Sequence, residues 1–222
     1  MNTFYLLDFD FTLFKTHAGS SIFIEELAKA YPDEAREIER RVAESLVTGV
    51  SFAIRDATVE LVGELETHAI ETQYIARARS ENLLFDGVHE VMDYIETSGT
   101  RFGILTYGSV SGQTMKIHAA QLQHVPFMVT DHKKKGELIA GWWREDHFII
   151  PESLGGGEAD EIVLVDDRLF SFEGLPDHAR GYWVQTGPAR YDPVGDVPAN
   201  VESADTLFEV IAAEKSRTLL TN

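Results

Sequence analysis

The chain has 222 residues, 44% of them apolar, which is enough for one well-buried core and a small accessory unit. It contains no cysteine, and this excludes disulfides, thiol nucleophiles and cysteine-ligated zinc. The formal net charge of −18 argues against a nucleic-acid polymer as partner. A small anionic substrate is compatible with that charge, because one cation or metal ion can dominate a single pocket.

The chain shows no stretch that is long and apolar enough to cross a bilayer. The first apolar run has no basic leader, is interrupted by aspartates and is followed by no small-residue cleavage site, so it does not resemble a signal peptide. We therefore expect a cytoplasmic protein with no membrane partner.

Short segments rich in β-branched and aromatic residues recur along the chain, separated by longer stretches with helical spacing. The predicted strands are Thr3–Phe9, Arg101–Thr106, Phe127–Thr130, Glu161–Val165 and Gly181–Gln185. They are apolar almost throughout, which is typical of strands buried on both faces of a parallel sheet. Strands that alternate with helices predict an α/β fold with an open, doubly wound and mostly parallel sheet.

Two of the intervening helices are well marked. Apolar residues follow helical spacing over Val88–Ile95, and the pattern stops before Gly99, a residue suited to end a helix. The last helix is predicted to begin near Ser203 and to carry its apolar residues from Leu207 to Ile211.

The interval 16–82 breaks the alternation, because it has helical periodicity and no strand pattern. We expect a small all-helical unit at 16–82, inserted into an α/β core made of residues 1–15 and 83–222. A second irregular segment is Lys133–Trp143, in which Gly136 and Gly141 bracket a short apolar run. A surface β-hairpin or another extended excursion is predicted there.

Chemically reactive side chains follow the predicted strands, and the carboxyl ends of strands are where sites form in open α/β sheets. They are Asp8 and Asp10 where the first strand ends, Thr106 and Tyr107 where the second ends, Lys133 after the third, and Asp166 and Asp167 after the fourth. A lone Asp-x-Asp is ordinarily a turn. The conjunction of all these groups, in an order compatible with one sheet edge, is what predicts a site.

These residue types suit phosphoryl transfer. Two carboxylates two residues apart, such as Asp8 and Asp10 where a strand gives way to a loop, can be aimed differently, so that one attacks phosphorus while the other handles protons. A magnesium ion held by Asp8 and an acid of the Asp166–Asp167 pair would supply the positive charge that an anionic substrate needs. Lys133 would add a second cation, and the Thr106 hydroxyl would donate to phosphate.

The sequence resembles the haloacid dehalogenase-like hydrolase superfamily over nearly its whole length. DFDFT is similar to the Asp-x-Asp-x-Thr first motif of that superfamily, GILTYG to the second motif, and LVDDR to the fourth. The segment FDGVHEVMDYIETSGTRFGILTYG resembles the helix–strand unit that precedes the second motif in many members. The resemblance implies a Rossmann-like core and a helical cap, for which the 16–82 unit is the candidate.

The resemblance also implies roles for the matched residues. Asp8 would be the nucleophile and Asp10 the general acid and then base. Magnesium would be held by Asp8, the backbone carbonyl of Asp10 and Asp166, with Asp167 in or near the shell of ligands. Thr106, with Tyr107 beside it, would bind phosphate. The third motif is a single lysine, for which the TDHK segment, similar to the deoxyribonucleotidase branch, favours Lys133; the alternatives are Lys116, Lys134 and Lys135.

The function that these expectations favour is magnesium-dependent hydrolysis of a small phosphorylated metabolite through an aspartyl-phosphate on Asp8. The presence of Asp10 disfavours dehalogenation, because displacing a halide needs no acid for the leaving group. A phosphomutase or nucleotidase of the same superfamily is an alternative, and so is a catalytically idle binding or regulatory protein. Nothing in the 16–82 interval identifies the substrate.

Overall fold

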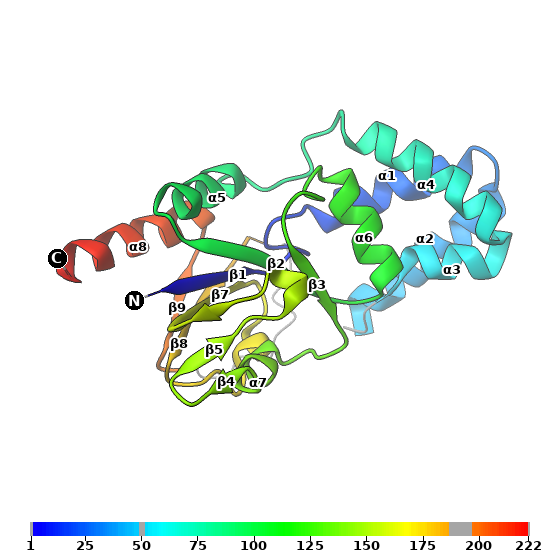
Figure 1. Cartoon of the computed structure of the whole chain (residues 1–222). Helices are drawn as coiled ribbons and strands as arrows, with labels where there is room; N and C mark the ends of the chain where they lie inside the picture. Colours follow the sequence, from blue (N-terminus) through cyan, green and yellow to red (C-terminus); the bar gives the residue numbers. More distant parts are fainter. Residues whose placement is uncertain (1, 49–51, 187–196, 222) are drawn as a thin grey trace.

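The structure, a computed structural model, describes residues 2–48, 52–186 and 197–221. Within these residues the main sheet is parallel and has the strand order β3-β2-β1-β7-β8-β9 (Figure 1). Its strands are β1 (Thr3–Leu7), β2 (Arg101–Tyr107), β3 (Phe127–Thr130), β7 (Glu161–Asp166), β8 (Ala179–Val184) and β9 (Val201–Ala204). Leu7 of β1 is paired with Ile104 on one side and Val165 on the other, so the chain winds outward from β1 in both directions. The predicted doubly wound α/β fold is confirmed.

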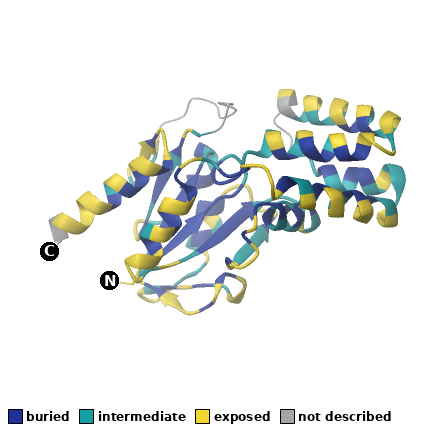
Figure 2. Ribbon diagram, turned by 90° about the horizontal axis from the view of Figure 1, so that it is seen from above, coloured by how far each residue is buried: buried dark blue, intermediate teal, exposed yellow. Residues whose placement is uncertain are grey.

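Both faces of the sheet are covered, because successive side chains of a strand point to opposite faces. Tyr5 and Leu7 belong to an apolar cluster that includes residues of α5, α6 and α8, whereas Phe4 and Leu6 belong to a second cluster with residues of α7. These helices are α5 (Val88–Thr97), α6 (Val110–Ala119), α7 (Lys135–Ala140) and α8 (Leu207–Thr221). Figure 2 shows the strands buried between helices whose outer faces are exposed.

A small antiparallel sheet and two 3₁₀ segments complete the second cluster. The sheet has the order β4-β5-β6, and its strands are β4 (Trp143–Arg144), β5 (His147–Ile149) and β6 (Glu158–Ala159). The 3₁₀ segments are η1 (Glu152–Leu154) and η2 (Leu169–Phe172). Phe148 of β5 and Phe172 of η2 are buried in this cluster, which closes the face of the main sheet opposite α5 and α8.

Helices α1 to α4 gather at one end of the molecule (Figure 1). They are α1 (Thr16–Ala28), α2 (Pro32–Thr48), α3 (Ile54–Val62) and α4 (Glu64–Ala78). Helix α1 packs on α2 and α4, and α6 of the core contacts both α3 and α4. Pro32 begins α2, where its fixed φ suits the first helical position and no amide donor is lost. The helices fall inside the interval 16–82, and the division of the chain into a core and a cap domain stays a prediction.

Two sequence expectations are wrong in this part of the fold. The predicted hairpin at Lys133–Trp143 is instead mostly the helix α7, and antiparallel pairing begins only at Trp143. Ser203 lies in the edge strand β9, and the last helix begins at Leu207. The helix α5 is as expected: it ends at Thr97, and Gly99 follows with a left-handed φ of 72°.

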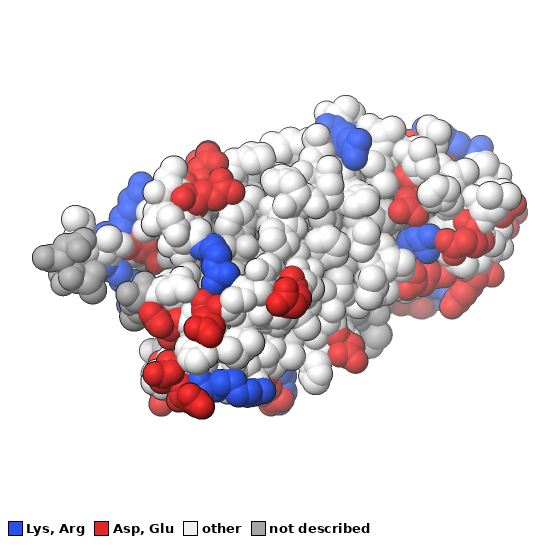
Figure 3. All heavy atoms as spheres, in the orientation of Figure 1, with Lys and Arg blue, Asp and Glu red and all other residues white. Residues whose placement is uncertain are grey.

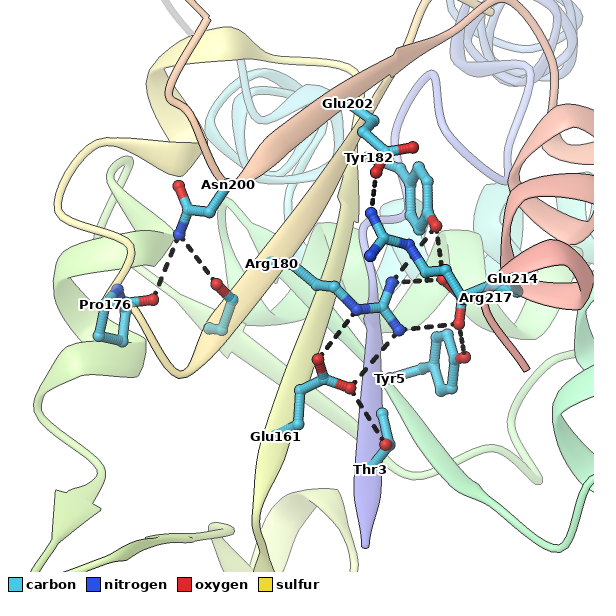
Figure 4. A network of polar contacts seen from close by, with 11 residues as sticks. Thr3, Tyr5, Glu161, Pro176, Arg180, Tyr182, Asn200, Glu202, Glu214 and Arg217 are labelled. Atoms are coloured by element: carbon cyan, nitrogen blue, oxygen red, sulfur yellow. Dashed lines mark hydrogen bonds and ion pairs between the residues drawn. The ribbon is translucent and has the colours of Figure 1, made fainter. Parts of the chain in front are cut away.

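A network of buried polar side chains fastens α8 to the sheet (Figure 4). Arg180 of β8 donates from Nη2 to Oε2 of Glu214 on α8 over 2.8 Å, and from Nε to Oε1 of Glu161 over 3.0 Å. The hydroxyls of Tyr5 and Tyr182 also donate to Glu214. Burial raises the pKa of Glu214, but the hydrogen bonds from Arg180, Tyr182 and Tyr5 outweigh it, so the pKa lies below its ordinary value. Glu214 is thus held as a carboxylate.

The excess of acidic residues is spread over the surface. On the face in Figure 3, acidic side chains lie at both ends of the molecule, interspersed with lysine and arginine. Within the described ranges, no helix has the length and apolar character that crossing a bilayer requires.

Candidate active site

Three aspartates meet where β1 and β7 end side by side. Asp8 follows β1 directly, Asp166 is the last residue of β7, and Asp167 comes next in the chain. The amide of Asp8 donates to the carbonyl of Val165 over 2.8 Å, which continues the parallel pairing into the loop. Carboxylate oxygens of the three aspartates lie within 4.8 Å of one another. This is the point where the winding direction of the sheet reverses, the usual position of a site in such folds.

A buried lysine lies against two of these acids. The ammonium group of Lys135 donates to Asp8 and, over 2.6 Å, to Oδ2 of Asp166, and the lysine is only 2% exposed. Lys135 is the first residue of α7, and the next residue explains how the helix comes so close. A Cβ on Gly136 would lie 2.5 Å from the carbonyl oxygen of Glu173, so only glycine lets α7 pack this tightly beside η2.

The structure places Lys135, and not Lys133, in contact with the carboxylates. Lys133 is exposed, and its ammonium lies 5.6 Å above the ring of Tyr107, although it lines the same cavity. Lys134 is bound to Glu137 and Glu173 at the surface. The choice of Lys133 from sequence depended on the similarity of the TDHK segment to the deoxyribonucleotidase branch, whereas the start of α7 turns the third lysine of the run, Lys135, toward the carboxylates.

The negative charges of the three aspartates repel one another, and the single positive charge of Lys135 does not fully offset this repulsion. Burial raises the pKa of Asp8, the Lys135 cation lowers it and the Asp166 charge raises it again, with a net value of about 7. Burial and the charges of Asp8 and Asp166 likewise hold the pKa of Asp167 well above its ordinary value. Burial lowers the pKa of Lys135, but the charges of Asp166 and Asp8 outweigh this and raise it. The lysine is therefore charged, and the cluster has a surplus of negative charge.

This donor set fits magnesium. The three carboxylates offer oxygen atoms close enough to share one ion, and Mg²⁺ prefers a few carboxylates together with water and phosphate oxygens. Asp166 is oriented by the amide of Arg168, which donates to its Oδ1 over 2.8 Å. A divalent cation would also neutralise the charge surplus that raises the pKa of Asp8.

Asp10 is engaged by a different set of partners. Its carboxylate accepts hydrogen bonds from Thr16 Oγ1 over 2.7 Å, from Gln113 Nε2 over 2.8 Å, and from Lys116 Nζ over 2.6 and 2.5 Å. Burial raises the pKa of Asp10, but the charge of Lys116 and the hydrogen bonds from Lys116, Gln113 and Thr16 outweigh it, so the pKa is lowered. Thr16 begins α1 and the other two lie on α6, so Asp10 connects the first helix of the 16–82 unit to the core.

Thr106 and Tyr107, the last two residues of β2, border the same cavity. Thr106 is completely buried, and its Oγ1 has no hydrogen-bond partner among the described residues. Tyr107 is half-buried, and its backbone carbonyl accepts a 2.8 Å hydrogen bond from Gln113. A buried hydroxyl without a partner costs free energy unless a ligand supplies one.

The cavity that joins these groups has a volume of about 310 Å³. The site residues predicted from sequence, namely Asp8, Asp10, Thr106, Tyr107, Lys133, Asp166 and Asp167, all line it. Its opposite wall comes from the helical unit and includes Val42, Phe52 and Ile54. A second hollow of about 390 Å³ lies between α5 and the segment that follows α6, and none of the predicted groups borders it. The first cavity has the size of a small-molecule site.

Sequence reasoning did not single out three residues that the structure places at this site, namely Lys135 and Lys116, which were alternatives for the third motif, and Gln113. Lys135 and Ile139 are both buried and stand four residues apart, the spacing of one helical face, and this signal could have identified Lys135. Lys116 was a candidate for binding phosphate, but it pairs with Asp10. Gln113 gave no signal, because its contacts depend on how α6 lies against the loop after β1.

Comparison with known proteins places the fold. No protein-family model matches the sequence, and no curated protein matches it. Among solved structures, a haloacid dehalogenase-like hydrolase from Burkholderia xenovorans is similar with a TM-score of 0.64 and 16% identity, covering 97% of each chain. The HAD-hydrolase YfnB from Bacillus subtilis, bound to magnesium, has a TM-score of 0.56 and 13% identity, covering 96% of this chain and 98% of that one.

CbbY from Rhodobacter sphaeroides, in complex with xylulose-1,5-bisphosphate, has a TM-score of 0.54 and 17% identity and covers 94% of this chain and 96% of its own. At these identities the similarity establishes the fold alone. The chain has the fold of the haloacid dehalogenase-like hydrolases over nearly its whole length.

Proposed function

We propose that this chain, which has the fold of the haloacid dehalogenase-like hydrolases, is a magnesium-dependent phosphomonoesterase for a small phosphorylated metabolite. One observation carries the proposal: Asp8, Asp166, Asp167 and Lys135 converge at the carboxyl ends of the strands, beside the hydroxyl of Thr106, which has no partner among the described residues. The cluster offers a carboxylate nucleophile, one cationic group for a phosphoryl dianion and a donor for its oxygens. The cavity volume of about 310 Å³ supports a small substrate.

In the first step an oxygen of Asp8 attacks phosphorus, the bond from phosphorus to the leaving oxygen breaks, and an aspartyl-phosphate forms. The leaving oxygen takes a proton from Asp10. In the second step water attacks the phosphorus, gives its proton to Asp10, and the bond from phosphorus to Asp8 breaks. Phosphate is released and both aspartates return to their starting protonation states.

Magnesium would be held by the carboxylates of Asp8, Asp166 and Asp167 with the backbone carbonyl of Asp10, and it supplies positive charge to the transferring phosphoryl group. Lys135 takes the role of the phosphate-binding lysine in this proposal, because it is the lysine that touches Asp8 and Asp166. The hydroxyl of Thr106 donates to a phosphoryl oxygen and thereby gains the partner that it lacks among the described residues.

Asp10 has to carry a proton into the first step. In the structure Lys116 holds it as a carboxylate, which suits the second step, in which Asp10 accepts a proton from water. Productive binding therefore requires that the contact with Lys116 loosens. Because Asp10 also accepts a hydrogen bond from Thr16 at the start of α1, a movement of the helical unit would change the hydrogen bonding of Asp10.

The test is phosphate release by the purified protein from p-nitrophenyl phosphate with magnesium, with and without EDTA. We expect magnesium-dependent release that EDTA abolishes, and a ³²P-labelled, acid-stable and hydroxylamine-sensitive protein adduct that is absent in Asp8→Asn. A phosphomutase would transfer phosphate to an added sugar faster than to water. Binding of phosphate without turnover or adduct would contradict the proposal and favour an idle binding protein.

A further inference from the structure

The loop after β1 contains a strained aromatic residue. Phe11 has a φ of 63°, in the left-handed region, which bulky side chains rarely adopt and which costs on the order of 1 kcal/mol or more. The conformation is held from both sides of the residue. The amide of Phe11 donates to the carbonyl of Phe14 over 3.0 Å, and the hydroxyl of Thr186 donates to the carbonyl of Phe11. Glycine would adopt the same backbone without strain.

Core packing does not explain why a phenylalanine stands at this position. The neighbouring rings of Phe9 and Phe14 are completely buried and stacked, with centroids 5.0 Å apart. Phe11 is only half-buried and, within the described part of the chain, belongs to neither of the two apolar clusters. Its ring meets His17 edge to face, with centroids 4.9 Å apart. The strain at Phe11 is therefore not offset by burial in the core.

The ring of Phe11 instead lines the catalytic cavity, together with Tyr107 and Phe170. These two are also half-buried and, among the residues described, absent from both apolar clusters. Cations lie over both of them: Lys133 is 5.6 Å from the Tyr107 ring centroid and Arg168 is 5.8 Å from that of Phe170. No such contact is recorded for Phe11 in the described residues, so its ring is the one best suited to an uncharged partner.

The cavity thus has two unlike parts. Its floor holds the charged groups that the proposed function assigns to the phosphoryl group. The helical unit contributes an apolar patch to the wall, made of Val42, Phe52, Ala53 and Ile54, beside the polar residues Thr16, His17, Ser20 and Ser45. A leaving group would extend from the floor past Phe11 toward this wall. Aromatic faces favour other flat rings in offset or edge-to-face contact, and apolar walls favour apolar ligands.

We propose that the substrate is a phosphomonoester whose leaving group carries a flat, uncharged ring, and that Phe11 determines this specificity by contacting the ring. The inference rests on the proposed phosphomonoesterase function. It explains why a strained aromatic residue is retained where the core does not need it: the ring binds the leaving group, and the backbone strain is a cost to stability that serves specificity.

The experiment compares kcat/KM for benzyl phosphate and ethyl phosphate, two esters of primary alcohols that differ by the ring. The ratio of the two values is measured for the unchanged protein, for Phe11→Gly, which removes the ring and the strain together, and for Phe11→Tyr, which keeps the ring. We expect a ratio well above one in the unchanged protein, about a tenfold lower ratio in Phe11→Gly, and a retained ratio in Phe11→Tyr.

Glu145→Gly is the matched control. Glu145 also has a positive φ, 53°, and is exposed in the turn between β4 and β5, so this change relieves similar strain far from the cavity and leaves the ratio unchanged. If both esters are hydrolysed and Phe11→Gly keeps the ratio of the unchanged protein, the specificity inference is overturned and the phosphomonoesterase proposal stands. If neither ester releases phosphate with magnesium, both are overturned.

Discussion

The network around Glu214 and the cluster around Asp8 both contain buried carboxylates beside the main sheet. They differ in how many hydrogen-bond and ion-pair partners these carboxylates have. Each carboxylate oxygen of Glu214 accepts from a tyrosine hydroxyl and from Arg180, and the pKa of Glu214 is lowered. In the other cluster Lys135 serves two acids, the pKa of Asp8 is raised to about 7, and the hydroxyl of Thr106 has no partner in the described residues.

The difference separates a structural arrangement from a functional one. A saturated network has nothing left to bind and contributes to the stability of the fold. The unsaturated cluster retains charge and hydrogen-bonding capacity that a cation and a phosphoryl group would complete. The comparison predicts that substitutions in the network around Glu214 lower the free energy of unfolding with little effect on kcat. Substitutions in the cluster around Asp8 should act mainly on kcat or kcat/KM.

The largest effect is expected for Asp8→Asn. Removing the nucleophile should lower kcat for phosphate release by about 10⁴-fold. The melting temperature should stay the same or rise, because one of three crowded acids becomes neutral. Phosphate release and thermal unfolding measured on the same preparation would test this. Activity within tenfold of the unchanged protein would exclude Asp8 as the nucleophile.

Lys135→Met and Lys133→Met form a matched pair, since both remove one cation from the same lysine run. Lys135→Met leaves two buried carboxylates without their cation, so in EDTA the free energy of unfolding should fall by about 3–5 kcal/mol. With magnesium, kcat/KM should fall by about 10²-fold or more.

Lys133 is exposed, so Lys133→Met should change the free energy of unfolding by less than about 0.5 kcal/mol. It should also lower kcat/KM much less than Lys135→Met does. Denaturant unfolding and steady-state kinetics on the two variants give the comparison. A larger kinetic effect for Lys133 than for Lys135 would return the phosphate-binding role to the residue chosen from sequence.

That pair also shows what the sequence could and could not predict. The strands that end in Asp8 and Asp166 were predictable, because each is an uninterrupted apolar run with acids directly after it. Their meeting follows from parallel topology, since the carboxyl ends of adjacent strands lie at one edge. The burial of Lys135 was not predictable in the same way, because it depends on α7 packing against η2, a contact between segments distant in sequence.

The missed elements are those with the weakest local pattern. Strand β9 is short, and two of its residues, Glu202 and Ser203, are exposed, so it lacks the apolar run that marked the other strands of the sheet. Gly136 and Gly141 at the two ends of α7 suggested a turn, whereas Gly136 is needed for close packing. In both places tertiary contacts override the local signal.

Arg180→Met tests the structural side of the comparison. The buried carboxylate of Glu214 and the half-buried carboxylate of Glu161 would lose the half-buried cation that they share, so the free energy of unfolding should fall by about 3 kcal/mol. The kcat of the folded fraction should be unchanged, because among the described residues no side-chain hydrogen bond joins Arg180 or Glu214 to a residue that lines the cavity. The double variant Arg180→Met/Glu214→Met, which removes both charges, should recover part of the lost stability. If the fully folded Arg180→Met variant had a lower kcat than the unchanged protein, the network around Glu214 would not be separate in function from the cluster around Asp8.

The smallest effect is expected in the pH dependence of stability, where the two acids should act with opposite signs. The folded pKa of Glu214 lies below its ordinary value of 4.5, so the unfolded state binds more protons around this pH. Its contribution is present above pH 4.5 and is lost as the pH falls through the folded pKa. The folded pKa of Asp8 is raised from 3.8 to about 7, so its contribution is present below pH 3.8 and is lost as the pH rises toward 7.

The free energies of unfolding of the unchanged protein, Glu214→Gln and Asp8→Asn, measured from pH 3 to 8 in EDTA, would separate these contributions. The substituted side chains, Gln and Asn, do not titrate in this range. In the unchanged protein the Glu214 carboxylate makes the free energy of unfolding rise with pH at the acidic end, and this rise should be smaller in Glu214→Gln. The Asp8 carboxylate makes the free energy of unfolding fall between pH 4 and 7, and this fall should be smaller in Asp8→Asn. EDTA is needed because a divalent cation would neutralise the Asp8 cluster and remove its raised pKa. If both variants shifted the pH profile in the same direction, the two clusters would not differ in the way that their hydrogen bonding indicates.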